Sequence, residues 1–419
     1  MKEIAIIAAA AAAAVGIAAG TNSGTFWDIA EKAAQSITAS SAVEDPNCGT
    51  MPPEERHALT KISANGSFTH NLNTLMPTDK NYMFSPFSIK AALVLAANGA
   101  DSDTLKQIEN VLQSGDINKL NTDIQSLTKT YESLENTEVK IADSIWLNTD
   151  VAEGSQFNKD YIATVKKFFN TEPNTVNNGN AVNAINGWCD KHTNGKIKEI
   201  IDDPDFMAAL VNAVYFNGKW EYQFEKESTA KRTFTDRNGK KTDIDFMNKT
   251  HSYNFYKDKD IKVIELPYSD GRLAMYAYLS NDKRVDIEKY FDKLSSKEVI
   301  VSIPKFKTEY SRELNDDLQA LGITKAFDKY NAEFKKMFEN YTPDTNFYID
   351  EVLHKTYIDV NEEGTEAAAV TAVMMRNCTT SVSEKPHPEE FIADSPFGYC
   401  IADKQTHEIL FMGEYAFAE

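Results

Sequence analysis

The order of helical and strand-like patterns along the chain constrains its fold more than any other feature of the sequence. Apolar residues recur at helical spacing mainly in the first half, whereas β-branched and aromatic runs dominate the second half. Strict alternation of strands and helices would indicate a doubly wound sheet, and a fixed-period repeat a solenoid, but the sequence has neither. Because no low-complexity linker interrupts residues 57–419, the pattern predicts one mixed α+β domain.

The individual elements follow from the same patterns. Helices are expected over Phe68–Met76, Ile89–Ala97 (opened by Ser85-Pro86), Asp103–Leu112, Ile117–Leu134, Asn158–Phe169, Ala181–Thr193 and Arg312–Leu321. Strands are expected over Val139–Leu147, Ala209–Phe216, Ile261–Leu266, Arg272–Leu279, Glu298–Phe306, Leu353–Val360, Phe397–Ala402 and Ile409–Tyr415.

The N-terminus has the pattern of an export signal. Lys2 precedes the apolar stretch Ile4–Ala19, which is shorter than the ~18 residues of a membrane-spanning helix and ends in small residues. We therefore expect residues 1–20 to be a signal peptide and residues 21–56 a polar leader or tether. An uncleaved membrane anchor or an N-terminal helix is the alternative. The expected location is secreted or extracellular, with attachment to a surface if the tether is retained.

The charge of the chain excludes several classes of partner. Lys and Arg number 44 against 63 Asp and Glu, which gives a formal charge of -19. Such a field repels phosphate backbones and anionic headgroups, so we expect no nucleic-acid partner. Basic residues occur only as scattered pairs such as Lys240-Lys241, and no heparin site is evident.

The cysteines do not indicate a framework or a metal site. The chain has four, namely Cys48, Cys189, Cys378 and Cys400, which are too few and too widely spaced for a set of disulfides or for zinc. Cys189 and Cys400 lie in apolar or mixed contexts, and we expect both to be buried. No metal is expected.

Catalytic motifs are missing from the sequence. It contains no GxSxG, HExxH, GxGxxG or P-loop pattern. The seven histidines and four cysteines cannot be paired into a nucleophile and a base from spacing alone. His354, in a strand-like run, is expected to be a buried, hydrogen-bonded histidine. A hydrolase with a Cys/His pair stays open as an alternative.

The connection between Asn361 and Phe397 is the most informative region. Long connections between strands in compact domains usually carry function. Residues 362–373 are small and alanine-rich, and at a period of two Thr365, Ala367 and Ala369 fall on one side. An exposed alanine-rich helix would fit the same residues, and the pattern alone does not decide between them.

At this point several motifs, in the right order, resemble the serpin family over nearly all of residues 57–419. They are Phe84-Ser85-Pro86-Phe87-Ser88-Ile89, Leu210–Trp220, Leu353-His354-Lys355, the loop from Glu362 to Thr371, Phe391 with Pro396-Phe397, and Phe411-Met412-Gly413. The resemblance implies the serpin fold, with three β-sheets, about eight to nine helices and an exposed reactive-centre loop. It also implies a protease inhibitor, not an enzyme, that acts as a monomer without cofactor.

In that mechanism the loop is bait, and after cleavage its hinge side inserts into the main sheet and traps the protease covalently. The resemblance places the hinge at Glu362, Glu363, Gly364, Thr365, Glu366, Ala367, Ala368 and Ala369. Insertion needs small residues on the inward side, because an unpaired charge buried there would cost several kcal/mol. Thr365 and the alternate alanines satisfy this, Glu366 points outward, and Gly364 gives a permissive pivot.

The resemblance also assigns residues that let the sheet open. It maps the shutter to Ser85, Ser88, Asn212 and His354, whose polar groups can exchange hydrogen bonds between two arrangements. It maps the breach, where the loop first enters, to Trp220. Ordinary core packing would be the expectation for these residues without the family match.

The scissile bond is assigned by the family's usual distance from Glu362, which gives Cys378-Thr379. A cysteine suits the shallow primary pocket of an elastase-like or subtilisin-like protease. Arg376-Asn377 lies close by, and Arg376 would instead suit a trypsin-like protease. A non-inhibitory serpin is the competing interpretation, although bulky, charged or proline-rich hinge positions would have signalled it.

Overall fold

The computed structural model describes residues 66–152, 155–282, 284–339, 347–365 and 387–418. The expected signal peptide, the leader and Cys48 lie outside the described residues. Among the helices that are described, none is long and apolar enough to cross a membrane.

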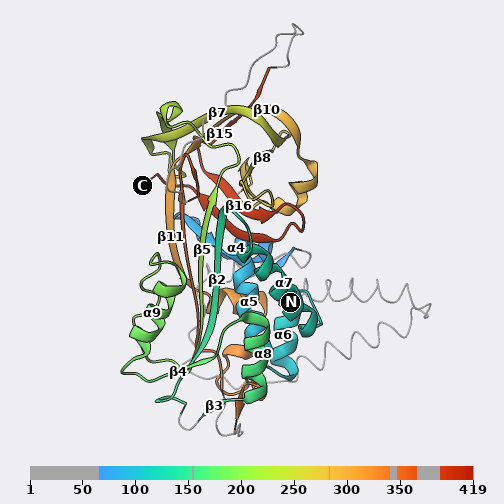
Figure 1. Cartoon of the computed structure of the whole chain (residues 1–419), viewed down its shortest axis with the longest axis vertical. Helices are drawn as coiled ribbons and strands as arrows, with labels where there is room; N and C mark the ends of the chain where they lie inside the picture. Colours follow the sequence, from blue (N-terminus) through green and yellow to red (C-terminus); the bar gives the residue numbers. More distant parts are fainter. Residues whose placement is uncertain (1–65, 153–154, 283, 340–346, 366–386, 419) are drawn as a thin grey trace, which may run out of the picture. The chain divides into compact units, whose positions relative to one another are not determined.

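A six-stranded sheet forms the long axis of the domain (Figure 1). Its strands, in spatial order, are β11 (Phe306–Glu313), β13 (Glu351–Val360), β14 (Gly364–Thr365), β5 (Ala208–Lys219), β2 (Thr137–Asn148) and β4 (Asn174–Val176). Helix α9 (Ala181–His192) lies on one side of this sheet and α5 (Pro86–Ala97) on the other. Because both faces are covered, β5 reads as an almost continuous apolar run and is buried along most of its length.

The second sheet has nine strands and caps the upper part of the six-stranded sheet. Its path is β1 (Tyr82–Phe84), β17 (Ile409–Tyr415), β16 (Phe397–Asp403), β9 (Leu273–Ser280), β8 (Ile261–Pro267), β7 (Lys241–Lys257), β10 (Ser295–Pro304) and β15 (Glu389–Ile392), with β6 (Ala230–Thr235) on β7. A small third sheet pairs β12 (Phe338–Glu339) with β3 (Gln156–Phe157). The expected α+β fold with three sheets is confirmed.

The helices gather mainly around the lower part of the six-stranded sheet. Besides α5 and α9 they are α4 (Phe68–Leu75), α6 (Ser102–Val111), α7 (Ile117–Glu132), α8 (Lys159–Phe169) and α10 (Asn315–Leu321), with short 3₁₀ turns at Lys226–Ser228, Ile287–Lys293 and Lys325–Phe327. Helix α5 begins at Ser85, whose side chain accepts a hydrogen bond from the Ser88 amide at 3.2 Å. Pro86 follows at the first helical position, where its missing N–H costs nothing. This cap fixes the start of α5 beneath the sheet.

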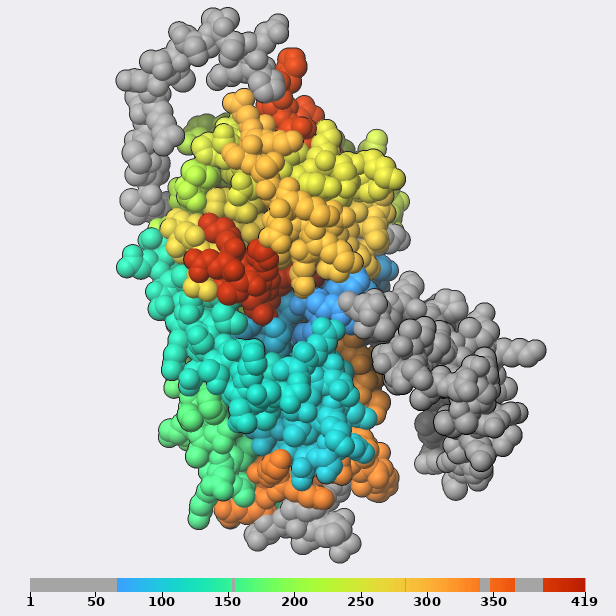
Figure 2. Space-filling model, turned by 90° about the vertical axis from the view of Figure 1, so that its right-hand side faces the viewer, coloured from blue at the N-terminus to red at the C-terminus, as the bar shows by residue number. Residues whose placement is uncertain are grey.

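Segments that are far apart in the sequence meet at the surface. Figure 2 shows the C-terminal segment in red between the teal helices and the yellow strands. There Lys90 of α5 forms an ion pair of 2.5 Å with Glu408, in the turn between β16 and β17. The end of the chain therefore ties the helical layer to the nine-stranded sheet.

One expectation about local structure was wrong, and one long strand was missed. The helix expected over Arg312–Leu321 begins only at Asn315, because residues 306–313 form β11. In β11 every second residue is buried up to Tyr310, which is the period of a strand and not of a helix. At the end of the strand Arg312 forms a two-armed ion pair with Asp317 of the helix. The strand β7 was not expected, since most of its 17 residues are polar or exposed.

Candidate functional site

In the six-stranded sheet, strands β5 and β13 pair directly, in parallel, along only part of their length. The pair runs from Ala209–Tyr215 on β5 to Glu351–Tyr357 on β13, and we call it the seam. Beyond the seam the two strands separate, and β14 lies between them, with Thr365 opposite both Gly218 and Val360. The chain that leaves β13 thus turns back and begins to enter its own sheet.

The first inserted residue must be a glycine. A Cβ on Gly364 would lie 2.1 Å from the carbonyl oxygen of Gly218 and 2.7 Å from the Cα of Lys219, which are both backbone atoms. No rotamer change could relieve that contact. Gly364 therefore permits close approach of two backbones, in addition to any freedom it gives the pivot.

Thr365 occupies the inward side of the sheet. It is 0% exposed, and its Oγ1 lies 2.8 Å from the hydroxyl of Tyr268. A small hydroxyl side chain fits here because it can be buried while its oxygen still takes part in a hydrogen bond. The structure thus places this hinge residue between β5 and β13 before any cleavage.

The two glutamates before Gly364 are held by basic side chains. Glu362 accepts hydrogen bonds from Thr229, at 2.8 Å, and from Lys305, at 3.0 Å. Partial burial opposes its ionisation, but these bonds outweigh burial and hold the pKa of Glu362 below its usual value. Glu363 pairs with Lys226 at 2.8 Å. Together these contacts anchor the turn between β13 and β14.

Trp220 supports the same turn from below. Its indole stacks on Tyr268, with ring centroids 4.7 Å apart and planes 11° apart. Its Nε1 donates to the carbonyl of Asn361 at 2.9 Å, and its amide donates to the carbonyl of Glu363 at 3.0 Å. The residue assigned to the breach is therefore in direct contact with the start of the hinge.

The shutter residues form one buried hydrogen-bond network. The Ser85 amide donates to Nε2 of His354 at 3.1 Å, so the neutral imidazole carries its proton on Nδ1 and donates to Oδ1 of Asn212. The Asn212 amide group donates in turn to Ser88 and to Oδ1 of Asp143. All four assigned residues are at most 1% exposed.

Asp143 belongs to this network but was not among the expected residues. It lies opposite Asn212 in the β2–β5 pair and is 8% exposed. The available signal was a carboxylate within the apolar run Ile141–Trp146. A carboxylate in such a run needs a hydrogen-bonding reason for its burial.

Burial moves the pKa values of the two titratable members in opposite senses. Desolvation lowers the pKa of His354 to about 3, so the ring is neutral at ordinary pH. Desolvation raises the pKa of Asp143 to about 7, and the hydrogen bonds from Asn212 and Ser88 offset only part of that rise.

The network crosses the seam at one bond. His354 is on β13 and Asn212 is its partner on β5, so their side-chain hydrogen bond joins the two strands. A strand that entered between β5 and β13 would have to break this bond. The geometry suits a contact that holds the sheet closed and can be released.

Other expected site residues lie outside the described residues. These are Glu366, Ala367, Ala368 and Ala369 of the hinge, Arg376 and Asn377, and the reactive bond Cys378-Thr379. Cys189 and Cys400 are buried free thiols, as expected. Within the described ranges no three His, Cys, Asp or Glu side chains are grouped as metal ligands would be.

The comparisons with known proteins agree on the family. The family model described as serpin (serine protease inhibitor) matches residues 63–416. The chain belongs to the serpin family. An uncharacterized serpin-like protein of Methanosarcina mazei is 32% identical to this serpin over 416 residues, which cover 90% of this chain and 93% of that protein.

Better-known serpins are similar over most of their length. Serpin B4 of Homo sapiens is 30% identical over 380 residues, which cover 81% of this serpin and 94% of that protein. The crystal structure of tengpin, a thermophilic serpin, in the native state matches with a TM-score of 0.76 and 28% identity, over 88% of this serpin and 96% of tengpin. Serpins are mostly protease inhibitors and not enzymes, although some members are non-inhibitory.

We predict that Gly364→Ala expels the start of the hinge from the sheet. The added Cβ would collide with the backbone of β5, and overpacking of this kind costs about 1 to 3 kcal/mol. Hydrogen exchange of the Thr365 amide should become about tenfold faster or more. Gly179→Ala, whose new Cβ would meet only a side-chain atom at 3.4 Å, is the control and should leave Thr365 unchanged. Unaltered protection of Thr365 in Gly364→Ala would show that β14 does not depend on this approach.

Proposed function

We propose that this serpin inhibits serine proteases as a suicide substrate, by inserting its cleaved loop between β5 and β13. The observation that carries the proposal is the position of β14, which already pairs with both strands at the upper end of the seam. Below it β5 and β13 pair directly, and each has a backbone edge that a longer inserted strand could use. The full length of the seam is thus the proposed path of insertion.

The covalent step is ordinary acyl transfer that stops halfway. The hydroxyl of the protease serine attacks the carbonyl carbon of the scissile bond, the peptide C–N bond breaks, and the nitrogen leaves as a new amino terminus. The acyl group stays on the serine as an ester. Insertion of the hinge side then has to outrun hydrolysis of that ester.

The hinge composition favours rapid insertion. Thr365 is already accommodated without exposure, and Ala367 and Ala369 follow it at a period of two. Small side chains would bury no unpaired charge as the strand advances. This composition supports an inhibitor over a non-inhibitory carrier or chaperone.

The proposed bait is Cys378, with cleavage before Thr379, and the proposed targets are elastase-like or subtilisin-like proteases. Arg376 with Asn377 is the alternative bait and would direct the inhibitor to trypsin-like proteases. With residues 1–20 as a signal peptide, the proposed place of action is outside the cell.

We predict that Thr365→Arg turns the inhibitor into a substrate. A guanidinium in the space now filled by Thr365 would be buried without a partner and would slow insertion, so the ester would hydrolyse first. The measurement is the yield of protease complex that survives hot detergent. Glu366→Arg, on the other side of the period-two pattern, is the control and should keep most of the yield. Full yield from Thr365→Arg would rule out insertion as the trapping step.

We also predict that cleavage within the loop makes this serpin more resistant to heat. Insertion would add a strand to a sheet that the intact chain keeps partly open behind a kinetic barrier. Thermal unfolding of the intact and cleaved forms, followed by circular dichroism, measures the difference. Equal unfolding temperatures would favour the non-inhibitory interpretation.

The fragment released during complex formation should identify the bait. If Cys378 enters the primary pocket, the new N-terminus is Thr379, and alkylation of Cys378 should block inhibition because it adds bulk to a shallow pocket. Arg376→Ala should leave elastase inhibition nearly intact. Mass spectrometry of the fragment is the measurement, and a new terminus at Asn377 would move the target class to trypsin-like proteases.

A further inference from the structure

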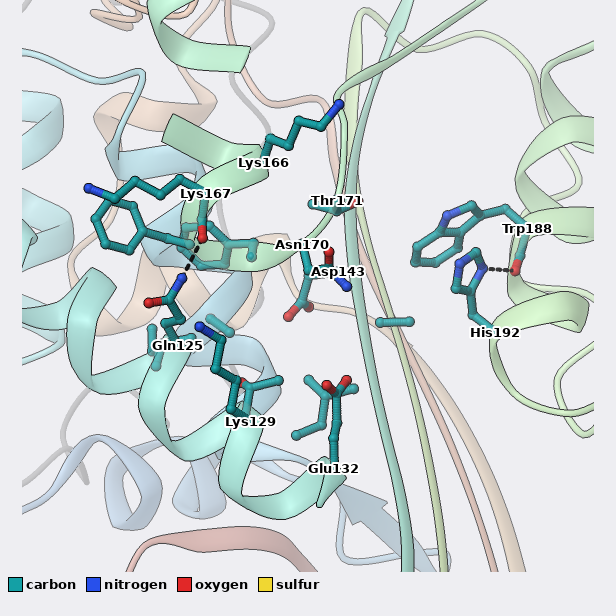
Figure 3. Close-up of a pocket in the computed structure, with 17 residues that line it drawn as sticks. Gln125, Lys129, Glu132, Asp143, Lys166, Lys167, Asn170, Thr171, Trp188 and His192 are labelled. Carbon is teal, nitrogen blue, oxygen red and sulfur yellow. Dashed lines mark hydrogen bonds between the residues drawn. The ribbon is translucent and has the colours of Figure 1, made fainter. Parts of the chain in front are cut away.

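A cavity of about 470 Å³ reaches the shutter network from the edge of the six-stranded sheet. Strand β4 pairs with β2 only over Trp146–Asn148, so residues 141–143 of β2 have no strand neighbour on that side within the described chain. The cavity lies along this uncovered part of β2, and Asp143 is among its lining residues. Figure 3 shows Asp143 between side chains of α7 and side chains of α9.

The hydrogen bonds to Asp143 come from partners that do not have to separate from it. Its Oδ1 accepts from Asn212, its neighbour in the β2–β5 pair, and from Ser88 of α5 at 3.4 Å. Parting of the seam breaks the bond between His354 and Asn212 instead. These hydrogen bonds therefore contribute similarly to the free energies of the closed and the parted sheet. Their contribution to the free-energy difference between the two states largely cancels.

The hydration free energy of Asp143 differs between the closed and the parted sheet, so it does not cancel. In the closed sheet the carboxyl group is almost fully buried, which disfavours its charged form. Parting of the seam frees the Oδ1 of Asn212 and lets water approach the residue that contacts Asp143. A carboxylate gains more from nearby water than a neutral carboxyl group does.

From this geometry we propose that Asp143 is a proton-dependent positioning residue for loop insertion. A proton on Asp143 keeps β5 and β13 together, and loss of that proton lets them part more readily. The proposal rests on the proposed function, since insertion through the seam is the step it controls. Asp143 acts through Asn212, its hydrogen-bond partner on β5.

The pKa of Asp143, raised by burial to about 7, puts the change near neutral pH. The sign follows from linkage: an acid whose folded pKa lies above its ordinary value of 3.8 stabilises the closed state most at low pH, and that stabilisation is lost as pH rises through about 7. In the closed sheet His354 does not titrate there, because its pKa is about 3. Parting would let that pKa return towards its ordinary value of 6.5, which would favour opening below that pH and so acts in the opposite sense to Asp143.

The charged groups around the cavity come from three helices. Lys129 and Glu132 line it from α7, Lys166 and Lys167 from α8, and His192 from α9. The Lys166 amine pairs with Glu172, and Nδ1 of His192 contacts the Trp188 carbonyl at 2.7 Å. Asn212 of β5 and the serines of α5 bring no charge to Asp143. His192 is the histidine among these neighbours, so it needs its own control.

The test measures opening of the seam directly. A fluorescein-labelled peptide with the sequence of residues 365–376 is mixed with the full-length, uncleaved serpin, and its association rate is followed from pH 6 to pH 8.5 at constant ionic strength. We expect the rate to rise with pH up to about 7 and to level off above it. Between pH 6 and this plateau the rise should reach up to about tenfold, when parting lowers the pKa of Asp143 by one unit or more.

Matched variants show which residue causes the rise of the association rate with pH, which we call the pH step. Asp143→Asn keeps an oxygen acceptor for Asn212 but cannot ionise, so its rate should be independent of pH from 6 to 8.5 and no higher than the rate of the natural sequence at pH 6. Glu351→Gln, on β13, removes another acid whose pKa is raised by burial to about 7 and should keep the step. His192→Gln should keep it too. If Asp143→Asn does not fold, Asp143→Ser replaces it.

Two results would overturn the proposal: no pH step in the natural sequence, or an undiminished step in the Asp143 variants. A step that disappears in Glu351→Gln or His192→Gln would assign the control to that residue instead. Failure to trap any protease, with the pH step intact, would reject the proposed function and leave the role of Asp143 standing. Covalent trapping of a protease without a pH step would support the proposed function and reject the role of Asp143.

Discussion

The parallel ladder between β5 and β13 is the contact on which the rest of this structure depends. It brings together strands about 140 residues apart, and two places along it are specialised. At the upper end the ladder is held apart by two inserted residues, and partway along it a single His354–Asn212 bond ties one strand to the other. Parallel pairs are slightly less stable per residue than antiparallel ones. The seam is thus a weaker kind of ladder than the antiparallel β2–β5 pair beside it.

The sequence carried enough information for the fold class and for much of the candidate site. Ser85, Asn212, His354 and Trp220 stand within motifs that resemble the family, and the structure brings them to the sheet and its upper opening. Asp143 could not be found in that way. A single acid in an apolar strand becomes meaningful only when the register places it opposite Asn212.

Local structure was hardest to predict where burial is sparse or mixed. Strand β7 is long because it pairs with β10 along ten residues, yet only four of its residues are buried. Its sequence therefore lacks the period that marks a strand. The segment around Arg312 was misread because a strand passes directly into a helix there, and an ion pair across the junction joins the two. In both places tertiary pairing decides the structure, and a local pattern does not contain it.

Strands β16 and β17 lie in the interior of the nine-stranded sheet, although every other strand of that sheet precedes them in the sequence. Strand β1, close to the start of the domain, has β17 as its neighbour and must wait for it. The nine-stranded sheet therefore cannot be completed during synthesis until Tyr415, the last residue of β17, has emerged from the ribosome. During that delay the exposed edges of β1 and β9 are open to other strands, including those of neighbouring chains. The arrival of β16 and β17 therefore sets the moment at which these edges are protected from aggregation.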